Sequence, residues 1–142
     1  MLRRGVLTLV VLAALAGVGA AQPAMGPEFR VNTYTTYYQR RPAVASDASG
    51  NFVVVWTSYF QDGSTSGVFG RRYASTGAPL GPEFRVNTYT TSYQSWLSVA
   101  SDSSGNFVVV WESALQDGSN SGIFGQRYSQ IVPVELMDFR VE

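Results

Sequence analysis

The sequence predicts an all-β protein made of two tandem four-stranded antiparallel sheets, and three observations lead to this prediction. The stretch GPEFRVNTYTT starts at Gly26 and recurs at Gly81, a period of 55 residues. About three-quarters of the positions in residues 26–73 are identical in the second copy, so the unit is duplicated as a whole. Each copy carries short apolar or alternating runs separated by turn-forming residues, and neither shows the apolar spacing of a helix.

The first two strands of a unit are expected at residues 28–34 and 39–46. In the former, Phe29 and Val31 alternate with polar residues, which predicts one buried face and one face open to water. In the latter, Pro42 has no N–H to donate, so this strand is expected at a sheet edge unless Pro42 lies at the start of the strand. Leu97 replaces Pro42 in the second copy, so the fold does not require the proline.

The third strand is expected at residues 52–56, a continuous Phe-Val-Val-Val-Trp run after a turn-rich loop. A strand that is apolar on both faces is expected to be buried on both faces. The sheets of this protein therefore need a neighbour on either side, or one sheet and another protein. The fourth strand is expected at residues 68–73, with Phe69 and Tyr73 on one face.

Four strands in about 55 residues is the size of a β-propeller blade, which predicts a propeller-like arrangement. We expect β-repeat 1 at residues 26–80, β-repeat 2 at residues 81–130 and a C-terminal tail at residues 131–142. The tail ends in DFRVE, which matches EFRVN at residues 83–87 after one period and predicts the first strand of a third repeat. An unrelated tail and a two-sheet β-sandwich are the alternatives.

Residues 1–21 have the pattern of a secretory signal peptide. Arg3 and Arg4 precede an apolar run that is too short to span a bilayer, and small residues follow up to Ala21. We therefore expect an exported protein in the periplasm, at the cell surface or outside the cell, with no membrane contact once the signal is removed. A retained membrane anchor is the alternative.

Composition narrows the classes of function. Without Arg3 and Arg4, eight arginines face ten acidic residues, a net charge of −2 that gives no basic footprint for nucleic acid. The chain has no Cys, so its stability depends on core packing or assembly rather than on disulfides. It also has no His and no Lys, which excludes Ser-His-Asp triads and Schiff-base chemistry and disfavours common zinc sites.

Three motifs recur in order at fixed spacing in both copies: NTYTT, SDxSGNFVVVW and QDGSxSGxFGxRY. Together they resemble a tandem β-repeat of exported and surface-attached bacterial proteins, most of them uncharacterised and usually with longer arrays. The resemblance covers residues 26–128. It implies a secreted, propeller-like repeat protein and brings no established catalytic residues. This chain differs in having only two full copies.

Positions that differ between the copies are the first candidates for ligand binding. Trp96 stands where the first copy has Arg41, next to the position of Arg40, and we expect this variable segment to be exposed. Trp56 and Trp111 could stack on a sugar ring, but their place at the end of the apolar strand favours core packing.

The acidic residues have two interpretations each. Asp47 and Asp102 open loops with alternating oxygen side chains, which makes them weak calcium candidates, although a hairpin turn is favoured. Asp62 and Asp117 begin polar loops at a sheet end, where a ligand could bind. Glu112 replaces Thr57 of the first copy and, with Asp117, is the best candidate for a glycosidase-type carboxylate pair.

The function expected from the sequence is that of an exported, non-catalytic β-repeat module for surface binding or adhesion. A carbohydrate or cell-surface ligand and self-association are the expected partners, with no cofactor unless calcium binds. A purely structural fragment of a longer surface array is the first alternative, and a glycoside hydrolase built on Glu112 is the second.

Overall fold

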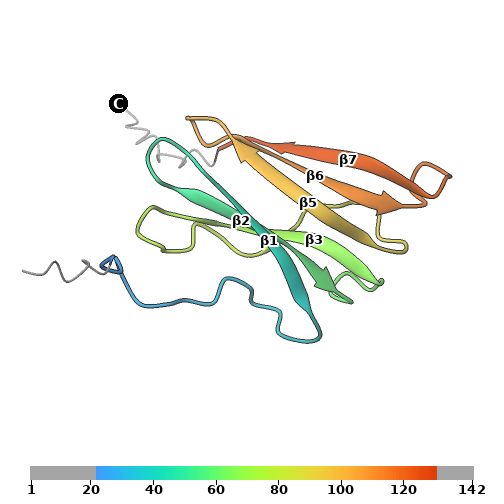
Figure 1. Ribbon diagram of the computed structural model, residues 1–142, viewed down its shortest axis with the longest axis horizontal. Coiled ribbons are helices and arrows are strands. Elements are labelled where there is room, and N and C mark those ends of the chain that lie inside the picture. The colour runs from blue at the N-terminus through green and yellow to red at the C-terminus, as the bar shows by residue number, and fades with distance from the viewer. Residues whose placement is uncertain (1–21, 131–142) are drawn as a thin grey trace, which may run out of the picture.

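Seven β-strands and no helix form residues 22–130, the part of the protein that this computed structural model describes (Figure 1). The strands are β1 Gln39–Ser46, β2 Phe52–Tyr59, β3 Ser66–Tyr73, β4 Phe84–Arg85, β5 Gln94–Ser101, β6 Phe107–Ala114 and β7 Ser121–Tyr128. The all-β prediction is confirmed. In this part of the chain no helix is long and apolar enough to cross a membrane.

The strands form two antiparallel sheets that do not close on each other. The first sheet has the order β1-β2-β3-β4 and the second the order β5-β6-β7. The first sheet has four strands as predicted, but the fourth, β4, comes from the second repeat, and the second sheet has three strands among residues 22–130. Residues 138–142, which would supply its fourth strand, lie outside the described residues, as does the expected signal peptide. The strand predicted at residues 39–46 coincides with β1, and β1 is an edge strand, as Pro42 requires.

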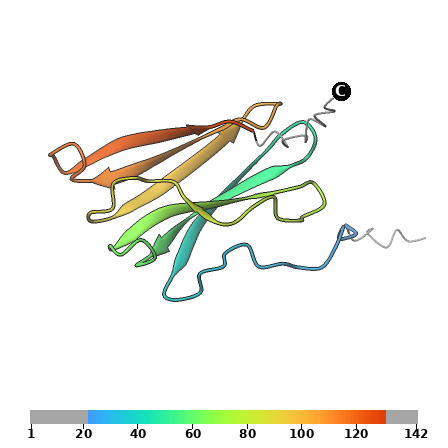
Figure 2. The ribbon, with the colours of Figure 1, turned by 180° about the vertical axis from the view of Figure 1, so that it is seen from behind.

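The strand predicted at residues 28–34 does not form. Its sequence-identical counterpart does form a strand, because Phe84 pairs with Gly70 and Arg85 pairs with Phe69. β4 therefore belongs to the second repeat in sequence and to the first sheet in space. An extended segment becomes a strand only beside another strand that accepts its backbone hydrogen bonds. Residues 22–36 instead run along the first sheet on the side away from the second sheet (Figures 1 and 2).

The hydrophobic core lies between the two sheets. Val53 and Val55 of β2 contribute to it from the first sheet, and Phe107, Val109 and Trp111 of β6 contribute from the second. Trp56 and Trp111 are both buried, as expected. Trp111 belongs to the core between the sheets, whereas Trp56 lies on the other face of β2. Side chains alternate between the two faces of a strand. β2 turns Val53 and Val55 toward the contact, whereas β6 turns Phe107, Val109 and Trp111 toward it. The two sheets therefore use opposite faces of the same repeat.

The face of the second sheet that points away from the core is open. Val110 occupies the repeat position of Val55, yet Val110 is 39% exposed and Val55 is 0% exposed. The prediction that the Phe-Val-Val-Val-Trp strand is buried on both faces is therefore wrong for β6 in the single chain. The cause is that the second sheet covers the Val55 face of the first sheet. Among the described residues, nothing covers the equivalent Val110 face of the second sheet.

Equivalent valines should therefore contribute differently to stability. We expect Val55→Ala to lower the free energy of unfolding by about 2 kcal/mol, since it removes two buried methyl groups and leaves a cavity. The matched variant Val110→Ala should cost less than about 1 kcal/mol, because its side chain already contacts water. Urea unfolding of dilute protein measures the free energy of unfolding of both variants. Equal losses would contradict the open face.

Candidate binding surface

Two β-bulges expose side chains at the edges of the two sheets. The register shifts between Arg40 and Ala43 in β1, and between Ser95 and Ser98 in β5. Bulges locally bend a strand and change the direction of its side chains. Both bulges thus interrupt the alternation of side chains between the two faces of the sheet, at the segment where Arg40 and Arg41 are replaced by Ser95 and Trp96.

Six non-glycine residues in the described part of the chain have a φ between 49° and 65°. They are three pairs at equivalent repeat positions: Tyr37 and Ser92, Arg41 and Trp96, and Phe60 and Leu115. The left-handed conformation costs a non-glycine residue roughly 1–2 kcal/mol. The surrounding hairpins and bulges impose this conformation in both copies, although the side chain differs in every pair.

Arg41 and Trp96, two of the predicted ligand-binding residues, are brought together by these bulges. The guanidinium carbon of Arg41 lies 3.5 Å from the centre of the Trp96 ring, and Nη1 of Arg41 donates a hydrogen bond to Ser95 Oγ at 3.0 Å. Trp96 nevertheless remains 65% exposed. A cation below the indole fixes the ring while leaving its surface accessible to a ligand.

Arg40 belongs to a neighbouring group of exposed aromatic side chains. Its guanidinium carbon lies 4.2 Å from the centre of the Tyr38 ring, and the rings of Tyr37 and Phe60 lie 4.7 Å apart. All three aromatic residues are exposed. We call Tyr37, Tyr38, Arg40, Arg41, Phe60 and Trp96 the aromatic–arginine strip.

Three members of this strip were not predicted from the sequence: Tyr37, Tyr38 and Phe60. The signal that identified Trp96 was available for two of them, because Ser92 and Leu115 replace Tyr37 and Phe60 in the second copy. Tyr38 is repeated as Tyr93 and could not be found in this way. A difference between copies does not by itself indicate exposure, however, because Ser95 and Thr57 also differ from their counterparts and are buried.

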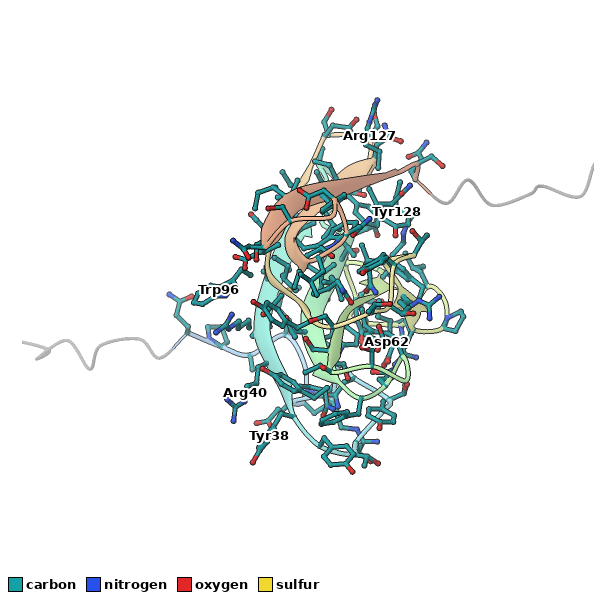
Figure 3. All side chains as sticks on the ribbon, turned by 90° about the vertical axis from the view of Figure 1, so that its right-hand side faces the viewer. Tyr38, Arg40, Asp62, Trp96, Arg127 and Tyr128 are labelled. Carbon is teal, nitrogen blue, oxygen red and sulfur yellow. The ribbon has the colours of Figure 1, made fainter. Side chains whose placement is uncertain are left out.

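Asp62 lies apart from the strip. Figure 3 shows Tyr38, Arg40 and Trp96 along one side of the molecule and Asp62 on the opposite side. The Asp62 carboxylate accepts hydrogen bonds from the Ser64 N–H at 3.1 Å and from Asn87 Nδ2 at 3.3 Å. The structure thus does not combine Asp62 with Trp96 in one site.

Asp117 and Glu112, the candidate carboxylate pair, are each engaged by a nearby serine. Asp117 Oδ1 accepts a hydrogen bond from the Ser119 N–H at 3.1 Å, and Glu112 Oε1 accepts one from Ser121 Oγ at 3.0 Å. These contacts order the β6–β7 hairpin. The hydrolase interpretation gains no geometric support from them and stays a prediction.

Asp47 and Asp102 organise the hairpin turns of their sheets. Asp102 accepts hydrogen bonds from the Ser104 N–H, the Asn106 N–H and Asn106 Nδ2 at 2.9, 3.0 and 2.7 Å, and Asp47 accepts an equivalent set in the first sheet. The hydrogen bond from the side-chain amide is the main cause that lowers the pKa of each carboxyl. Among residues 22–130 no group of three or more acidic side chains could hold a metal ion.

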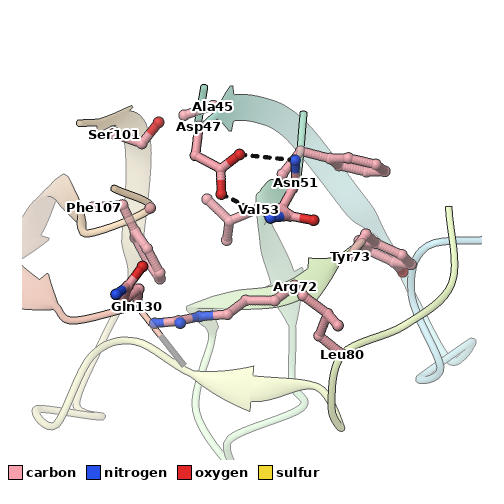
Figure 4. Close-up of a pocket in the computed structure, with 12 residues that line it drawn as sticks. Ala45, Asp47, Asn51, Val53, Arg72, Tyr73, Leu80, Ser101, Phe107 and Gln130 are labelled. Atoms are coloured by element: carbon pink, nitrogen blue, oxygen red, sulfur yellow. Dashed lines mark hydrogen bonds between the residues drawn. The ribbon is translucent and has the colours of Figure 1, made fainter. Parts of the chain in front are cut away.

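A cavity of about 80 Å³ lies between the sheets, close to the Asp47 turn (Figure 4). Arg72 lines it, with its guanidinium carbon 4.6 Å from the centre of the Phe107 ring and Nη2 donating to the Ser129 carbonyl at 2.6 Å. Burial lowers the pKa of Arg72 and raises the pKa of the neighbouring Tyr128. This arginine bridges the sheets, and a cavity of this size holds only a few waters.

The strip is thus the surface with the clearest capacity to bind a ligand. Exposed aromatic rings bury apolar area at little entropic cost, and arginines donate paired hydrogen bonds to carboxylate or sulfate groups. Comparison with known proteins gives no match: no protein-family model, no curated protein and no solved structure matches the chain.

The turn aspartates predict a defined pH dependence. A lowered folded-state pKa stabilises the fold above the unfolded-state pKa, near the ordinary value of 3.8, and this contribution is lost as the pH falls through the folded-state pKa. We expect Asp102→Asn to lower the urea midpoint at pH 7 and to have a much smaller effect at pH 2.5. Asp117→Asn, in another loop of the same sheet, is the control. An effect of Asp102→Asn that is independent of pH would contradict this role.

Proposed function

We propose that this protein is an exported, non-catalytic β-repeat module that binds a carbohydrate on a cell or matrix surface. The two sheets act in this proposal as blade-like units of propeller type, with each repeat supplying the last strand of the preceding unit. The observation that carries the proposal is Trp96, a large apolar side chain that stays exposed although its backbone conformation is costly.

The charge of the strip favours an acidic glycan. Arg40 and Arg41 lie beside Tyr38 and Trp96, and within residues 22–130 no acidic side chain accepts a hydrogen bond from either arginine. A sugar ring stacks its C–H face on an aromatic ring while its carboxylate or sulfate accepts hydrogen bonds from a guanidinium. A uronic acid polymer or a sulfated polysaccharide presents both groups at regular intervals.

A glycan array followed by calorimetry tests this function. We expect binding to an acidic polysaccharide that weakens with salt, and we expect Trp96→Ala to weaken it at least tenfold, which corresponds to about 1.4 kcal/mol. Arg41→Ala should weaken binding as well. Arg127→Ala, which removes an exposed arginine away from the strip, is the matched control and should bind as the wild type does (Figure 3).

The outcomes separate the alternatives. No binding to any glycan would remove the proposed ligand class and favour a purely structural role in a surface array. Binding that Trp96→Ala leaves unchanged would place the ligand elsewhere on the protein. Hydrolysis of the bound glycan that is lost in Glu112→Gln would instead support an enzyme.

A further inference from the structure

The outer edge of β7 is a strand edge that nothing covers within residues 22–130, although the equivalent edge of β3 is covered. β7 is the last strand of the second sheet, whereas β3 pairs with β4 in the first sheet. Ile123 of β7 is 76% exposed. A free strand edge presents unpaired backbone N–H and C=O groups to any extended segment of matching shape. The way in which β3 is covered shows what such a segment must provide.

On β3, the covering segment makes two backbone contacts with Val68. The Val86 N–H donates to the Val68 carbonyl at 2.7 Å, and the Val68 N–H donates to Asn87 Oδ1 at 2.7 Å. Asn87 also donates from Nδ2 to Asp62 Oδ2, at 3.3 Å. A valine backbone and an asparagine side chain thus attach the segment to the edge.

The β7 edge has the same receiving groups. Asp117 stands at the position of Asp62, and each of these carboxylates lies against a glycine, Gly122 or Gly67. A Cβ on either glycine would collide with the carboxylate, so the glycine keeps room for the aspartate beside the strand. The β6–β7 hairpin therefore has the same geometry for accepting a hydrogen bond from an asparagine amide, although no asparagine amide contacts Asp117 in this structure.

Residues 26–36 are identical to residues 81–91 and already have the local structure that binding requires. Asn32 Nδ2 donates to the Tyr34 carbonyl at 2.7 Å and to Gln39 Oε1 at 3.4 Å, as Asn87 Nδ2 does to Tyr89 and Gln94 at 2.9 and 3.3 Å. What Asn32 lacks is the pair of contacts that Asn87 makes with a preceding sheet. Residues 26–36 thus have the conformation of a segment that pairs with a strand edge, but no strand edge of their own sheet lies beside them.

We propose that the free edge of β7 binds residues 26–36 of a second copy of this chain, so that copies associate head to tail. In this complex Phe29 pairs with Gly125 and Arg30 with Phe124, as Phe84 and Arg85 pair with β3. Asn32 of the second copy accepts the Ile123 N–H and donates to Asp117. The proposal does not require glycan binding, and it places Arg40 of the aromatic–arginine strip in the contact between copies.

The open sheet faces complement each other in the same arrangement. The contact between the two sheets of one chain covers Val53 and Val55, and the counterparts Val108 and Val110 are the exposed valines of the second sheet. The second copy would cover these valines with the face of its β2 that carries Val54. Val54 is the counterpart of Val109, which β6 turns toward the core. Strand pairing and burial of apolar area therefore reinforce each other.

Two substitutions between the repeats also agree with this contact. Glu112 stands at the position of Thr57, and Arg40 stands at the position of Ser95; the contact between the sheets buries both Thr57 and Ser95. Docking of a second copy brings Glu112 and Arg40 into one interface with opposite charges. Complementary charges fix the register of such an interface.

The C-terminal residues 138–142 of the same chain are the competing occupant. They would place Glu142 at the position of Asn87. A glutamate has no amide N–H to donate to Asp117 and would set two carboxylates side by side. The identical segment of a second copy has the asparagine, so its chemistry fits better.

The first test is sedimentation velocity of residues 22–142 over a range of protein concentrations, without glycan. We expect wild-type chains to associate and Ile123→Pro to raise the dissociation constant at least tenfold, because the proline removes the N–H that faces the open edge. An edge strand tolerates proline at such a position. Ile123→Val, which restores the residue of the first repeat, is the control and should associate as the wild type does. Monomeric wild-type protein at all concentrations would overturn the proposal.

The second test uses the absence of natural cysteines. With both Arg30→Cys and Phe124→Cys, mild oxidation should give covalent ladders of many chains, whereas either substitution alone can give no more than a dimer. The peptide GPEFRVNTYTT should suppress the ladders, and the same peptide with aspartate at the asparagine position should not. Failure to form ladders, together with an intramolecular bond in the pair Phe124→Cys and Arg140→Cys, would show that the chain's own tail occupies the edge.

Discussion

The side chain of Asn87 holds the two repeats in one structure. Its amide contacts the β3 edge of the first sheet through Val68, the loop between β2 and β3 through Asp62, and the start of the second sheet through Gln94. Asn87 is almost completely buried, so each of these hydrogen bonds replaces one that water would otherwise make. This one side chain therefore links the β3 edge beside β4, the loop between β2 and β3, and the start of β5.

The regular elements could be predicted from the sequence, because they depend on local patterns. β1 lies where alternation and Pro42 place it, and the loops at Asp47 and Asp102 are the hairpin turns that their residues favour. The apolar run at residues 52–56 identifies β2 but not its full length. The ladder with β3 extends β2 to Tyr59, and such pairing depends on the partner strand rather than on the run itself.

Other features depend on the neighbours of a residue, which the sequence does not reveal. Residues 28–34 and residues 83–89 are identical in sequence, yet only the second copy contains a strand, because only that copy has a sheet edge beside it. Val55 and Val110 likewise have one sequence context and two degrees of burial. For the candidate site, exposure of Trp96 could be predicted from its difference between copies. Its contact with Arg41 arises from bulges on two sheets and could not.

The six residues with a left-handed backbone have a consequence for how this repeat can change. At three positions of the unit, shared hairpins and bulges fix the conformation, while the side chains are tyrosine or serine, arginine or tryptophan, and phenylalanine or leucine. These positions tolerate exchange without refolding, since the framework already bears the cost of the conformation in both copies. The repeat therefore combines one backbone framework with three positions at which the side chain differs between the copies.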